Sequence, residues 1–287
     1  MEEKHDSVVA AGGDLRQVYA ANALAKAGVA VTALGFADTA PFESVAVSGE
    51  LSALAQADLV LFPLTMTKGK ALNTPLYPGE ISFEDCLRRI PQGCAVYGGN
   101  VTEEERQLAE HYGVHIRDFF KVEELTIANA VLTAEGAIQQ AMEKLPVSLW
   151  KSRVLICSGG RISRALLPRL LAFGAQVTVA ARRPEQRIWA EAEGAKAVGL
   201  TNLSALLPEQ QLIINTIPQK VLGEKELSMV SPDCLLLELA SKPYGIDFEA
   251  AQKRGLQAVL ASGLPGKHCP KTAGELIANT VSNMRKG

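Results

Sequence analysis

The chain of 287 residues lacks the features that mark membrane, secreted or nucleic-acid-binding proteins. No apolar run is long enough to cross a bilayer. The first residues, Met1 to Asp6, include no apolar stretch of the kind that a secretory signal peptide requires. The formal net charge is only -2, so the sequence indicates no basic surface for nucleic acid or for an anionic membrane. We therefore expect a cytoplasmic protein whose ligands are small molecules.

Cysteine is scarce and shows no pattern. The five cysteines are odd in number, widely spaced, and never form a Cys-x-x-Cys pair. They are Cys86, Cys94, Cys157, Cys234 and Cys269. Such spacing indicates neither a disulfide framework nor a zinc site, so we expect reduced thiols and no bound metal. Internal repeats and low-complexity segments are lacking as well.

What the sequence does contain is an alternation of short apolar strands and helical segments in both halves of the chain. In the first half, an apolar strand over residues 7–11 ends in Gly12-Gly13, and Asp14 is a suitable N-cap for the helix that follows. The run over residues 59–64 is apolar throughout, which is typical of a strand buried on both faces. This alternation predicts an α/β protein with two doubly wound parallel sheets, one in each half.

The alternation and one intervening helix set the predicted domain boundaries. Residues 1–128 form the first domain, which lacks a phosphate-binding motif and is therefore expected to bind the substrate. Residues 129–146 are expected to be a hinge helix with Thr133 as its N-cap. Residues 147–270 form the second domain, and residues 271–287 form a C-terminal helix that is expected to pack back on the first domain.

The second domain opens with a strand, a glycine-containing turn, a helix and a second strand over residues 154–181. The dinucleotide-binding fingerprint Gly-x-Gly-x-x-Gly aligns with Ser-Gly-Gly-Arg-Ile-Ser at residues 158–163. Only the middle glycine, Gly160, is retained, at the position where the backbone approaches a phosphate most closely. We predict that the turn and the helix start hold the pyrophosphate of a dinucleotide, an ordinary glycine turn being the alternative. The predicted contacts are Ser158, Gly159, Gly160, Arg161 and Ile162.

The second strand of this segment ends in Arg182 and Arg183. NAD-dependent enzymes usually place Asp or Glu there, where it hydrogen-bonds the ribose hydroxyl. Two arginines suit a 2′-phosphate instead, so the sequence predicts NADP as the cofactor. The alternative is that both arginines are solvated loop residues.

Later strands of the second domain end in loops that are expected to face the cofactor. Ligands of open α/β sheets lie at the carboxyl ends of the strands. We therefore expect further cofactor contacts from Thr216, Ile217 and Pro218 after one strand, and from Ala240 and Lys242 after the next.

Several short motifs, in order along nearly the whole chain, resemble those of a known family. They are Gly-Gly-Asp-x-Arg at residues 12–16, Thr-Ala-Glu-Gly-Ala-Ile at 133–138, Leu-Ala-Ser-Lys-Pro at 239–243, Gly-x-Asp-Phe at 245–248, Gly-Leu-Pro-Gly-Lys at 263–267 and Pro-Lys-Thr-Ala-Gly at 270–274. On these motifs the sequence resembles the A subunit of dipicolinate synthase. It departs from the family's usual Gly-x-Gly-Arg-x-Gly through Ser158 and Ser163, and Tyr244 stands where a second glycine often follows the Lys-Pro pair.

The resemblance implies both a fold and an activity. It implies a flavodoxin-like N-terminal domain and an NADP-binding Rossmann domain, in a layout related to alanine dehydrogenase. The implied reaction forms dipicolinate (pyridine-2,6-dicarboxylate) from a dihydrodipicolinate that derives from the lysine pathway. The implied partner is the flavoprotein-like B subunit of dipicolinate synthase, and the implied setting is the mother-cell cytoplasm during sporulation.

The implied substrate carries two carboxylates, which determine the residues expected to bind it. Because an arginine can bind a carboxylate through two parallel hydrogen bonds, Arg16 is a natural partner. The predicted substrate-binding residues are Asp14, Arg16, Thr65 and Thr133. We expect Arg16 of the first domain and Lys267 of the second to hold the dianion in the cleft between the domains. Lys267 and Glu135 are the candidates for acid–base catalysis, although the helix dipole explains Glu135 equally well if it lies in the first turn of the hinge helix.

Two other functions are compatible with the same residues. The chain could be a non-catalytic or weakly catalytic cofactor-binding or scaffold subunit for a flavoprotein partner, and Ser158 and Ser163 favour that alternative. It could also be another NADP-dependent dehydrogenase acting on an amino or hydroxy acid. The sequence leaves open whether the substrate is the dihydro compound or its hydrated precursor, and whether the chain forms a homo-oligomer.

Overall fold

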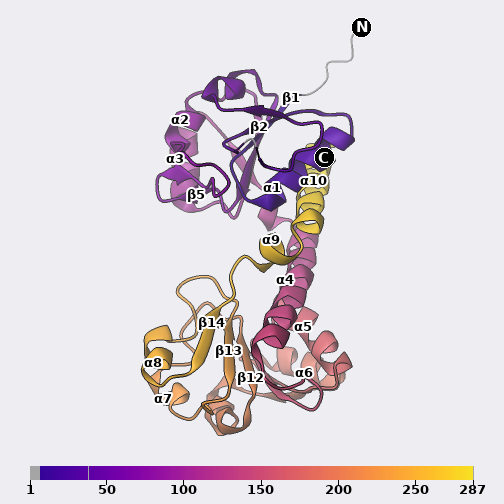
Figure 1. Ribbon diagram of the computed structural model, residues 1–287, viewed down its shortest axis with the longest axis vertical. Coiled ribbons are helices and arrows are strands. Elements are labelled where there is room, and N and C mark those ends of the chain that lie inside the picture. The colour runs from indigo at the N-terminus through magenta and orange to yellow at the C-terminus, as the bar shows by residue number, and fades with distance from the viewer. Residues whose placement is uncertain (1–6, 38, 287) are drawn as a thin grey trace. The chain divides into compact units, whose positions relative to one another are not determined.

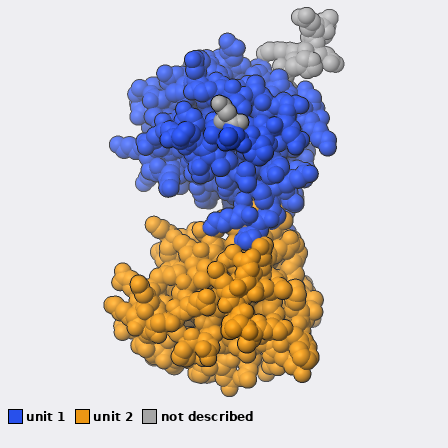
Figure 2. Space-filling view, in the orientation of Figure 1, with its two compact units in different colours: residues 1–128, 266–287 blue, residues 129–265 orange. Residues whose placement is uncertain are grey.

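The computed structural model describes residues 7–37 and 39–286, and the chain folds into two compact units. Unit 1 consists of residues 1–128 and 266–287, and unit 2 consists of residues 129–265 (Figure 2). Each unit is built on its own six-stranded sheet, and all strand pairs in both sheets are parallel (Figure 1). The prediction of an α/β protein with two doubly wound domains is confirmed.

The sheet of unit 1 has the strand order β3-β2-β1-β4-β7-β8. Without the short edge strand β3, this is the strand order of flavodoxin, as the resemblance implied. A separate antiparallel pair, β5 and β6, follows β4. The strands are β1 (Ser7–Ala11), β2 (Ala30–Leu34), β3 (Ala46–Ser48), β4 (Leu59–Leu64), β5 (Thr67–Lys68), β6 (Ala71–Leu72), β7 (Ala95–Gly99) and β8 (Ile116–Asp118). The helices are α1 (Leu15–Lys26), α2 (Phe83–Leu87), α3 (Glu103–His111) and α10 (Pro270–Lys286), with 3-10 turns at Leu51–Gln56 and Phe119–Lys121.

The sheet of unit 2 has the order β11-β10-β9-β12-β13-β14, which is the strand order of the dinucleotide-binding fold. The strands are β9 (Arg153–Cys157), β10 (Gln176–Ala180), β11 (Lys196–Val198), β12 (Leu212–Asn215), β13 (Leu235–Glu238) and β14 (Gln257–Leu260). The helices are α5 (Arg161–Ala172), α6 (Pro184–Ala192), α7 (Glu224–Leu227) and α8 (Phe248–Lys253), with 3-10 turns at Leu200–Ala205 and Leu207–Glu209. Helices α4 (Glu123–Lys144) and α9 (Leu264–His268) each cross a boundary between the units.

Alternate residues of the central strands face separate hydrophobic cores, so each sheet is covered on both faces. In unit 1, Val9 of β1 belongs to one core and Ala10 to another. In unit 2, Leu155 and Ile156 of β9 are divided in the same way. Because both faces are buried, these strands are apolar throughout instead of alternating with polar residues. No helix in the described part of the chain is both long and apolar enough to cross a membrane.

The start of the hinge helix differs from the prediction. Helix α4 begins at Glu123, ten residues before the predicted N-cap, and Glu123 and Glu124 supply the negative charge that favours a first turn. Thr133 therefore lies inside the helix, where its hydroxyl donates a hydrogen bond to the carbonyl of Asn129 at 2.7 Å. This bond back to the preceding turn replaces the capping role that we expected.

The C-terminal residues belong to unit 1 from Gly266 onward. Gly274 of α10 lies directly against the backbone of α1, and a β-carbon there would be 2.8 Å from the amide nitrogen of Ala20. A β-carbon on Gly266 would be 2.8 Å from a carboxylate oxygen of Asp14. This close packing corrects one expectation, because Lys267 belongs to the same unit as Arg16 and not to the second domain.

Candidate functional site

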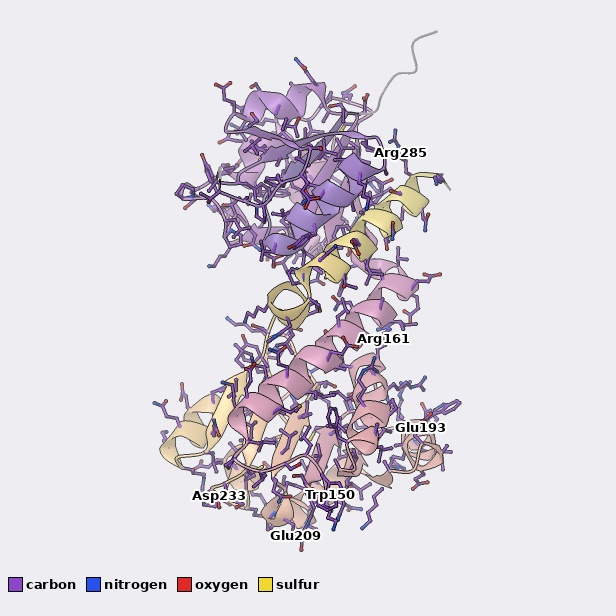
Figure 3. All side chains as sticks on the ribbon, turned by 45° about the vertical axis from the view of Figure 1, so that its right-hand side comes forward. Trp150, Arg161, Glu193, Glu209, Asp233 and Arg285 are labelled. Atoms are coloured by element: carbon purple, nitrogen blue, oxygen red, sulfur yellow. The ribbon has the colours of Figure 1, made fainter. Side chains whose placement is uncertain are left out.

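The central feature of unit 2 is the turn between β9 and α5. Strand β9 lies between β10 and β12, where the chain order of the sheet reverses, and ligands of α/β sheets bind at such a point. Gly160 is the N-cap of α5 and has no side chain to cap the helix, so the backbone N–H groups of the first turn are not satisfied by an N-cap side chain. Figure 3 shows that Arg161, in the first turn of α5, lies at one end of unit 2. Glu209 and Asp233 precede β12 and β13, and they lie at the opposite end of this unit.

The two glycines of the turn have different surroundings. A β-carbon on Gly159 would lie 2.5 Å from the Cβ atom of Gln186, so packing against α6 requires glycine there. A β-carbon on Gly160 would meet only the Ser158 hydroxyl, at 3.4 Å. Protein packing therefore does not require glycine at position 160. The open space at Gly160 and the uncapped helix start fit a phosphate group.

The two serines of the fingerprint also have different roles. Ser158 has a φ of 126°, a conformation that glycine adopts readily and serine rarely. Its hydroxyl accepts a hydrogen bond from the Gly160 N–H at 3.1 Å. Ser163 is only 2% exposed, and its Oγ atom has no hydrogen-bond partner. Ser158 thus occupies one N–H group of the turn, whereas Ser163 is a small buried residue on the inner face of α5.

Arginines surround the end of β10. Arg182 and Arg183 are exposed, and the Nε atom of Arg183 lies 3.3 Å from the Glu185 carboxylate in an exposed ion pair. Arg187 of α6, which was not among the residues selected from the sequence, donates hydrogen bonds to the carbonyls of Ala181 (3.1 Å) and Arg182 (2.8 Å). In the sequence, the feature that could have identified Arg187 is its position one helical turn after Arg183. The three arginines make this strand end strongly cationic.

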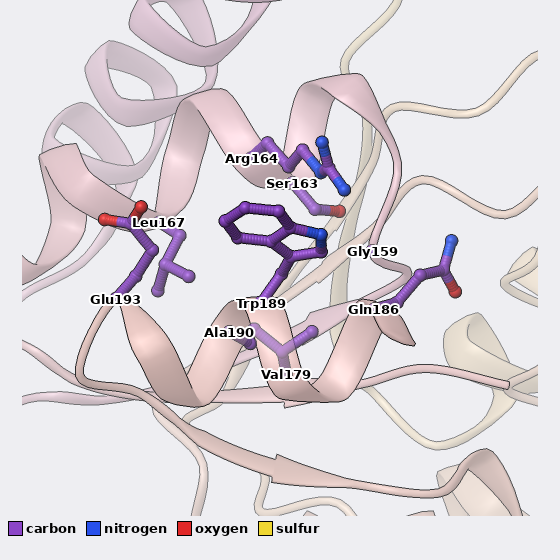
Figure 4. A pocket seen from close by; sticks show the side chains of 9 residues that line it. All are labelled: Gly159, Ser163, Arg164, Leu167, Val179, Gln186, Trp189, Ala190 and Glu193. Carbon is purple, nitrogen blue, oxygen red and sulfur yellow. The ribbon is translucent and has the colours of Figure 1, made fainter. Parts of the chain in front are cut away.

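A cavity of about 170 Å³ borders the glycine turn on its α6 side. Figure 4 shows the indole of Trp189 next to the side chains of Arg164 and Ser163, and the Arg164 guanidinium lies 5.4 Å from the centre of the Trp189 ring. The cavity is lined by Gly159, Ser163, Arg164, Leu167, Val179, Gln186, Trp189, Ala190 and Glu193. Two fingerprint positions, 159 and 163, therefore border open space between α5 and α6.

The loops after β12 and β13 are joined by two fully buried polar residues that were not predicted from the sequence. Asn215 ends β12 and Glu238 ends β13, and the Asn215 side-chain amide donates to the Glu238 carboxylate at 2.8 Å. The only signal in the sequence was a charged residue that ends an otherwise apolar strand. The predicted cofactor residues lie in these loops: Thr216, Ile217, Pro218, Ala240 and Lys242. Thr216 donates its backbone N–H to the Cys157 carbonyl at 3.2 Å, which brings its loop next to the glycine turn.

Four of the predicted substrate and catalytic residues gather at one edge of unit 1. The Arg16 guanidinium donates to the Asp14 carboxylate, with Nη2 at 2.8 Å, and to the Leu64 carbonyl at 2.6 Å. Thr65 follows Leu64 at the end of β4 and is exposed. Lys267 is also exposed and follows Gly266, which packs on Asp14 and Arg16. These residues lie where β1 and β4 end, at the point where the strand order of this sheet reverses.

The glycine turn of unit 1 does not offer its backbone to a ligand. The N–H of Gly12 donates to the Leu34 carbonyl at 2.8 Å, and that of Gly13 donates to the Asn73 carbonyl at 2.7 Å. Both glycines have positive φ, and a β-carbon on either would clash with neighbouring residues. Gly12 and Gly13 are therefore required by the turn itself.

Thr133 and Glu135 lie on α4, within unit 2, whereas the other four predicted residues belong to unit 1. Thr133 is buried and bonded to its own helix. Glu135 is exposed and lies 3.3 Å from Arg169 of α5. Since α4 begins at Glu123, Glu135 is not in the first turn, so the helix dipole does not account for it.

Cys157 lies directly before the glycine turn but is unsuited to nucleophilic chemistry. Burial above all, and then the nearby Glu238 charge, raises the pKa of its thiol to about 12. Burial likewise raises the pKa of Cys86 and Cys234 to about 12. These thiols stay protonated at neutral pH, which agrees with structural roles.

The fold and the glycine turn together define a class: a two-domain α/β protein whose second sheet has the strand order of the dinucleotide-binding fold. A solved L-alanine dehydrogenase has the same fold, with a TM-score of 0.66 and 12% identity, over 97% of this chain and 88% of that one. At this level of identity the likeness concerns the fold alone.

More similar proteins carry one particular name. Residues 7–120 match the model of the N-terminal domain of the dipicolinate synthase A subunit. The chain is 29% identical over 277 residues to the dipicolinate synthase A subunit of Bacillus subtilis (strain 168), covering 95% of this chain and 93% of that protein. The crystal structure of the dipicolinate synthase A subunit from Bacillus halodurans has a TM-score of 0.88 and 27% identity, over 98% of this chain and 97% of that one. The resemblance to the dipicolinate synthase A subunit is confirmed over nearly the whole chain.

Proposed function

We propose that this chain is the cofactor-binding subunit of a dipicolinate synthase, and that it oxidises dihydrodipicolinate to dipicolinate with NADP. The observation that carries the proposal is the start of α5, where Gly160 leaves open space beside backbone N–H groups that no N-cap side chain satisfies. A helix start of this kind is a general site for phosphate. The whole-chain similarity to the dipicolinate synthase A subunit supports the choice of reaction.

The residues of unit 2 would bind the cofactor from both sides of the strand-order reversal. The N–H groups at the start of α5 would hold the pyrophosphate. Arg182 and Arg183 would pair with a 2′-phosphate, and Arg187 holds the carbonyls of this strand end in place. No acidic residue ends β10, which favours NADP over NAD.

The Arg16 group of unit 1 would bind the carboxylates of the substrate. The Asp14 carboxylate and the Leu64 carbonyl fix the plane of the Arg16 guanidinium, whose side chain is only 12% exposed. A guanidinium fixed in this way loses little conformational freedom when it pairs with a carboxylate. Thr65 and Lys267 would add a hydroxyl and a second cation. Thr133, which is buried and already bonded to Asn129, is a weaker candidate.

The chemical step removes a hydride and a proton from the dihydropyridine ring, which becomes an aromatic pyridine. The nicotinamide of the cofactor, when bound, supplies the acceptor for the hydride. The chain has to orient the ring and accept the proton. Lys267 and Glu135 stay our candidates for the proton transfer, and both side chains are exposed.

The remaining parts of the proposal concern the setting of the reaction. Similarity to a protein named as the A subunit of a synthase supports the B subunit of that synthase as the partner, which we expect to be flavoprotein-like. We also propose a role in sporulation, in the mother-cell cytoplasm.

One observation favours the alternative of a weakly catalytic scaffold subunit. The Ser158 hydroxyl occupies the Gly160 N–H, so a phosphate would have to compete for that group. The alternative is separated from the main proposal by an assay of the purified chain with NADP, with and without its partner subunit. Dipicolinate formation that needs the partner's flavin and is independent of NADP would support the scaffold role.

Arg16→Ala tests the proposed reaction and substrate site together. We expect the apparent KM for dihydrodipicolinate to rise at least about tenfold, since a hydrogen bond to a charged group contributes about 1.5–3 kcal/mol. NADPH binding should be unchanged, because the substitution removes no cofactor contact. Steady-state kinetics with the partner subunit present provides the measurement.

Arg89→Ala is the matched control, since Arg89 is exposed on the same unit and lies outside the Arg16 group. Arg16→Lys separates charge from geometry, because lysine keeps the charge without the planar fork. If Arg16→Ala retains the parent KM, the Gly-Gly-Asp-x-Arg motif is structural and the substrate binds elsewhere.

A further inference from the structure

Glu238 is a fully buried carboxylate at the end of β13. Its Oε1 atom accepts hydrogen bonds from the Asn215 side-chain amide at 2.8 Å and from the Ala240 N–H at 2.9 Å. Its Oε2 atom accepts from the N–H groups of Gly245 and Ile246, both at 2.8 Å. None of the ion pairs among the described residues includes Glu238. Within the described part of the chain, four N–H donors and no cation therefore stabilise this carboxylate.

This arrangement requires an acidic residue. Burying a charge is unfavourable unless hydrogen bonds compensate it, and N–H donors to a carboxylate are strong ones. Both carboxylate oxygens of Glu238 accept two hydrogen bonds each. Glutamine has the same shape but would direct its own N–H groups at two of these donors. A neutral residue of equal size would therefore leave donors unsatisfied.

One of the four donors comes from the last residue of β12 and three come from the segment after β13. Asn215 begins the loop after β12, and its side chain also donates to the Ile217 carbonyl at 3.0 Å and accepts from the Ile217 N–H at 3.2 Å. Gly245, in the loop after β13, lies so close to the Asn215 side chain that a β-carbon would not fit. One carboxylate thus sets the conformation of both loops and their spacing.

These loops belong to the half of the fold that faces the second nucleotide of a dinucleotide. In this fold each half of the sheet binds one nucleotide, and the ligand crosses the point where the strand order reverses. The start of α5 and the Arg182–Arg183 pair lie on the β9–β11 half. Asn215 is the register partner of both Cys157 and Glu238, so both loops begin on the β12–β14 half: the loop after β12 directly beside β9, and the loop after β13 one strand further away.

We propose that Glu238 is a positioning residue for the nicotinamide half of the cofactor. It acts through Asn215 and the backbone of residues 240–246, and it does not touch the cofactor. This inference rests on the proposed function, because it assumes a dinucleotide at the start of α5. It assigns a role to the buried acid that ends β13.

The test separates the two halves of the cofactor. The probes are NADPH and adenosine 2′,5′-bisphosphate, which carries the adenine, the 2′-phosphate and one further phosphate but no nicotinamide. Calorimetric titration of the full chain should show that Glu238→Gln weakens NADPH at least about tenfold, because the two segments that hold the nicotinamide half lose their common acceptor. The same variant should bind the bisphosphate within about twofold of the parent, because the α5 start and the arginines are untouched.

Two further variants keep the outcome interpretable. Asn215→Ala removes one of the four donors and leaves the charge, so it should weaken NADPH less than Glu238→Gln and again spare the bisphosphate. Glu226→Gln is the control, since Glu226 accepts a single backbone N–H, from Gly223 at 3.1 Å, and should leave both probes unaffected. Folding of each variant is checked by circular dichroism, and Asn215→Ala carries the test if Glu238→Gln does not fold.

Two outcomes would overturn the inference. Variants that lose both probes equally would show that Glu238 has only a general structural role, and variants that retain parent affinity for NADPH would show that the loops do not position the cofactor. A parent chain that binds neither probe would overturn the proposed function as well.

Discussion

At the scale of single residues, Ser158 is the position where the sequence conflicts with the backbone. A φ of 126° strains a serine, and residues in such regions cost about 1–3 kcal/mol. Its hydroxyl also occupies the Gly160 N–H, which the proposed pyrophosphate would need. The serine therefore weakens the turn in two separable ways.

Ser158→Gly and Ser158→Ala separate these two effects. Both remove the hydroxyl, so we expect both to tighten NADPH binding roughly threefold to tenfold, the value of about one hydrogen bond. Only Ser158→Gly also removes the backbone strain, so it should melt at a higher temperature than Ser158→Ala. Calorimetric titration and thermal unfolding of the two variants provide the measurements. Weaker NADPH binding by both would show instead that the hydroxyl contacts the phosphate.

The sequence predicts the role of a residue when that role depends on residues that are close to it along the chain. Gly160, Arg182 and Arg183 follow from one strand–turn–helix–strand segment, so the sequence is enough to select them as candidates. Glu238 and Asn215 depend on hydrogen bonds between residues 23 positions apart, on neighbouring strands. Their pairing follows from strand register, which the sequence of a single strand does not contain.

At the scale of elements, N-cap residues in the sequence indicate where helices begin. The Asp14 carboxylate accepts the Arg16 N–H at 3.0 Å and caps α1, as predicted, and Thr102 and Glu105 form a capping box at the start of α3. The same logic failed at Thr133, because threonine inside a helix can bond to the carbonyl four residues earlier. A capping residue is thus a signal only when the preceding residues are not themselves helical.

The pairing of α1 with α10 depends on one glycine. A β-carbon on Gly274 would meet backbone atoms of Arg16 and Ala20, which cannot turn away as a side chain can. Gly274→Ala should therefore destabilise the protein by about 1–3 kcal/mol, the usual cost of overpacking. This loss would occur although alanine is favoured over glycine in a helix by about 1 kcal/mol.

Thermal unfolding checks this prediction, with Asn279→Ala as the control. Asn279 is exposed on the same helix, so its replacement should leave the midpoint unchanged or raise it slightly. A Gly274→Ala variant as stable as Asn279→Ala would mean that α10 can move away from α1 at little cost.

At the scale of the whole molecule, the sequence predicts two doubly wound sheets because their strands are apolar on both faces and alternate with helices. Strand order is less accessible from the sequence, and the edge strand β3 and the β5–β6 pair were not predicted. The sequence analysis paired Lys267 with Arg16 but placed it in the second domain, whereas Lys267 belongs to unit 1. This placement follows from the return of the chain to unit 1 at Gly266, which depends on close packing between segments about 250 residues apart.

The central claim is that the start of α5 binds the pyrophosphate of NADP. Gly160 has an ordinary φ of -81° and open space around it, so Gly160→Ala should fold and lose less than about 1 kcal/mol of stability. Gly49→Ala is the control, because a β-carbon on Gly49 would meet no atom within 4 Å, and Gly49 lies on the other unit. A double variant, Arg182→Ala with Arg183→Ala, tests whether these arginines determine the preference for NADP over NAD.

The most direct measurement is a fluorescence titration of these variants and the parent with NADPH and NADH. The parent should prefer NADPH, and Gly160→Ala should weaken both cofactors at least about tenfold because its methyl group occupies the phosphate position. Gly49→Ala should match the parent, and the double arginine variant should lose about tenfold or more for NADPH while it spares NADH. A folded Gly160→Ala variant with unchanged affinity for both cofactors would contradict the account.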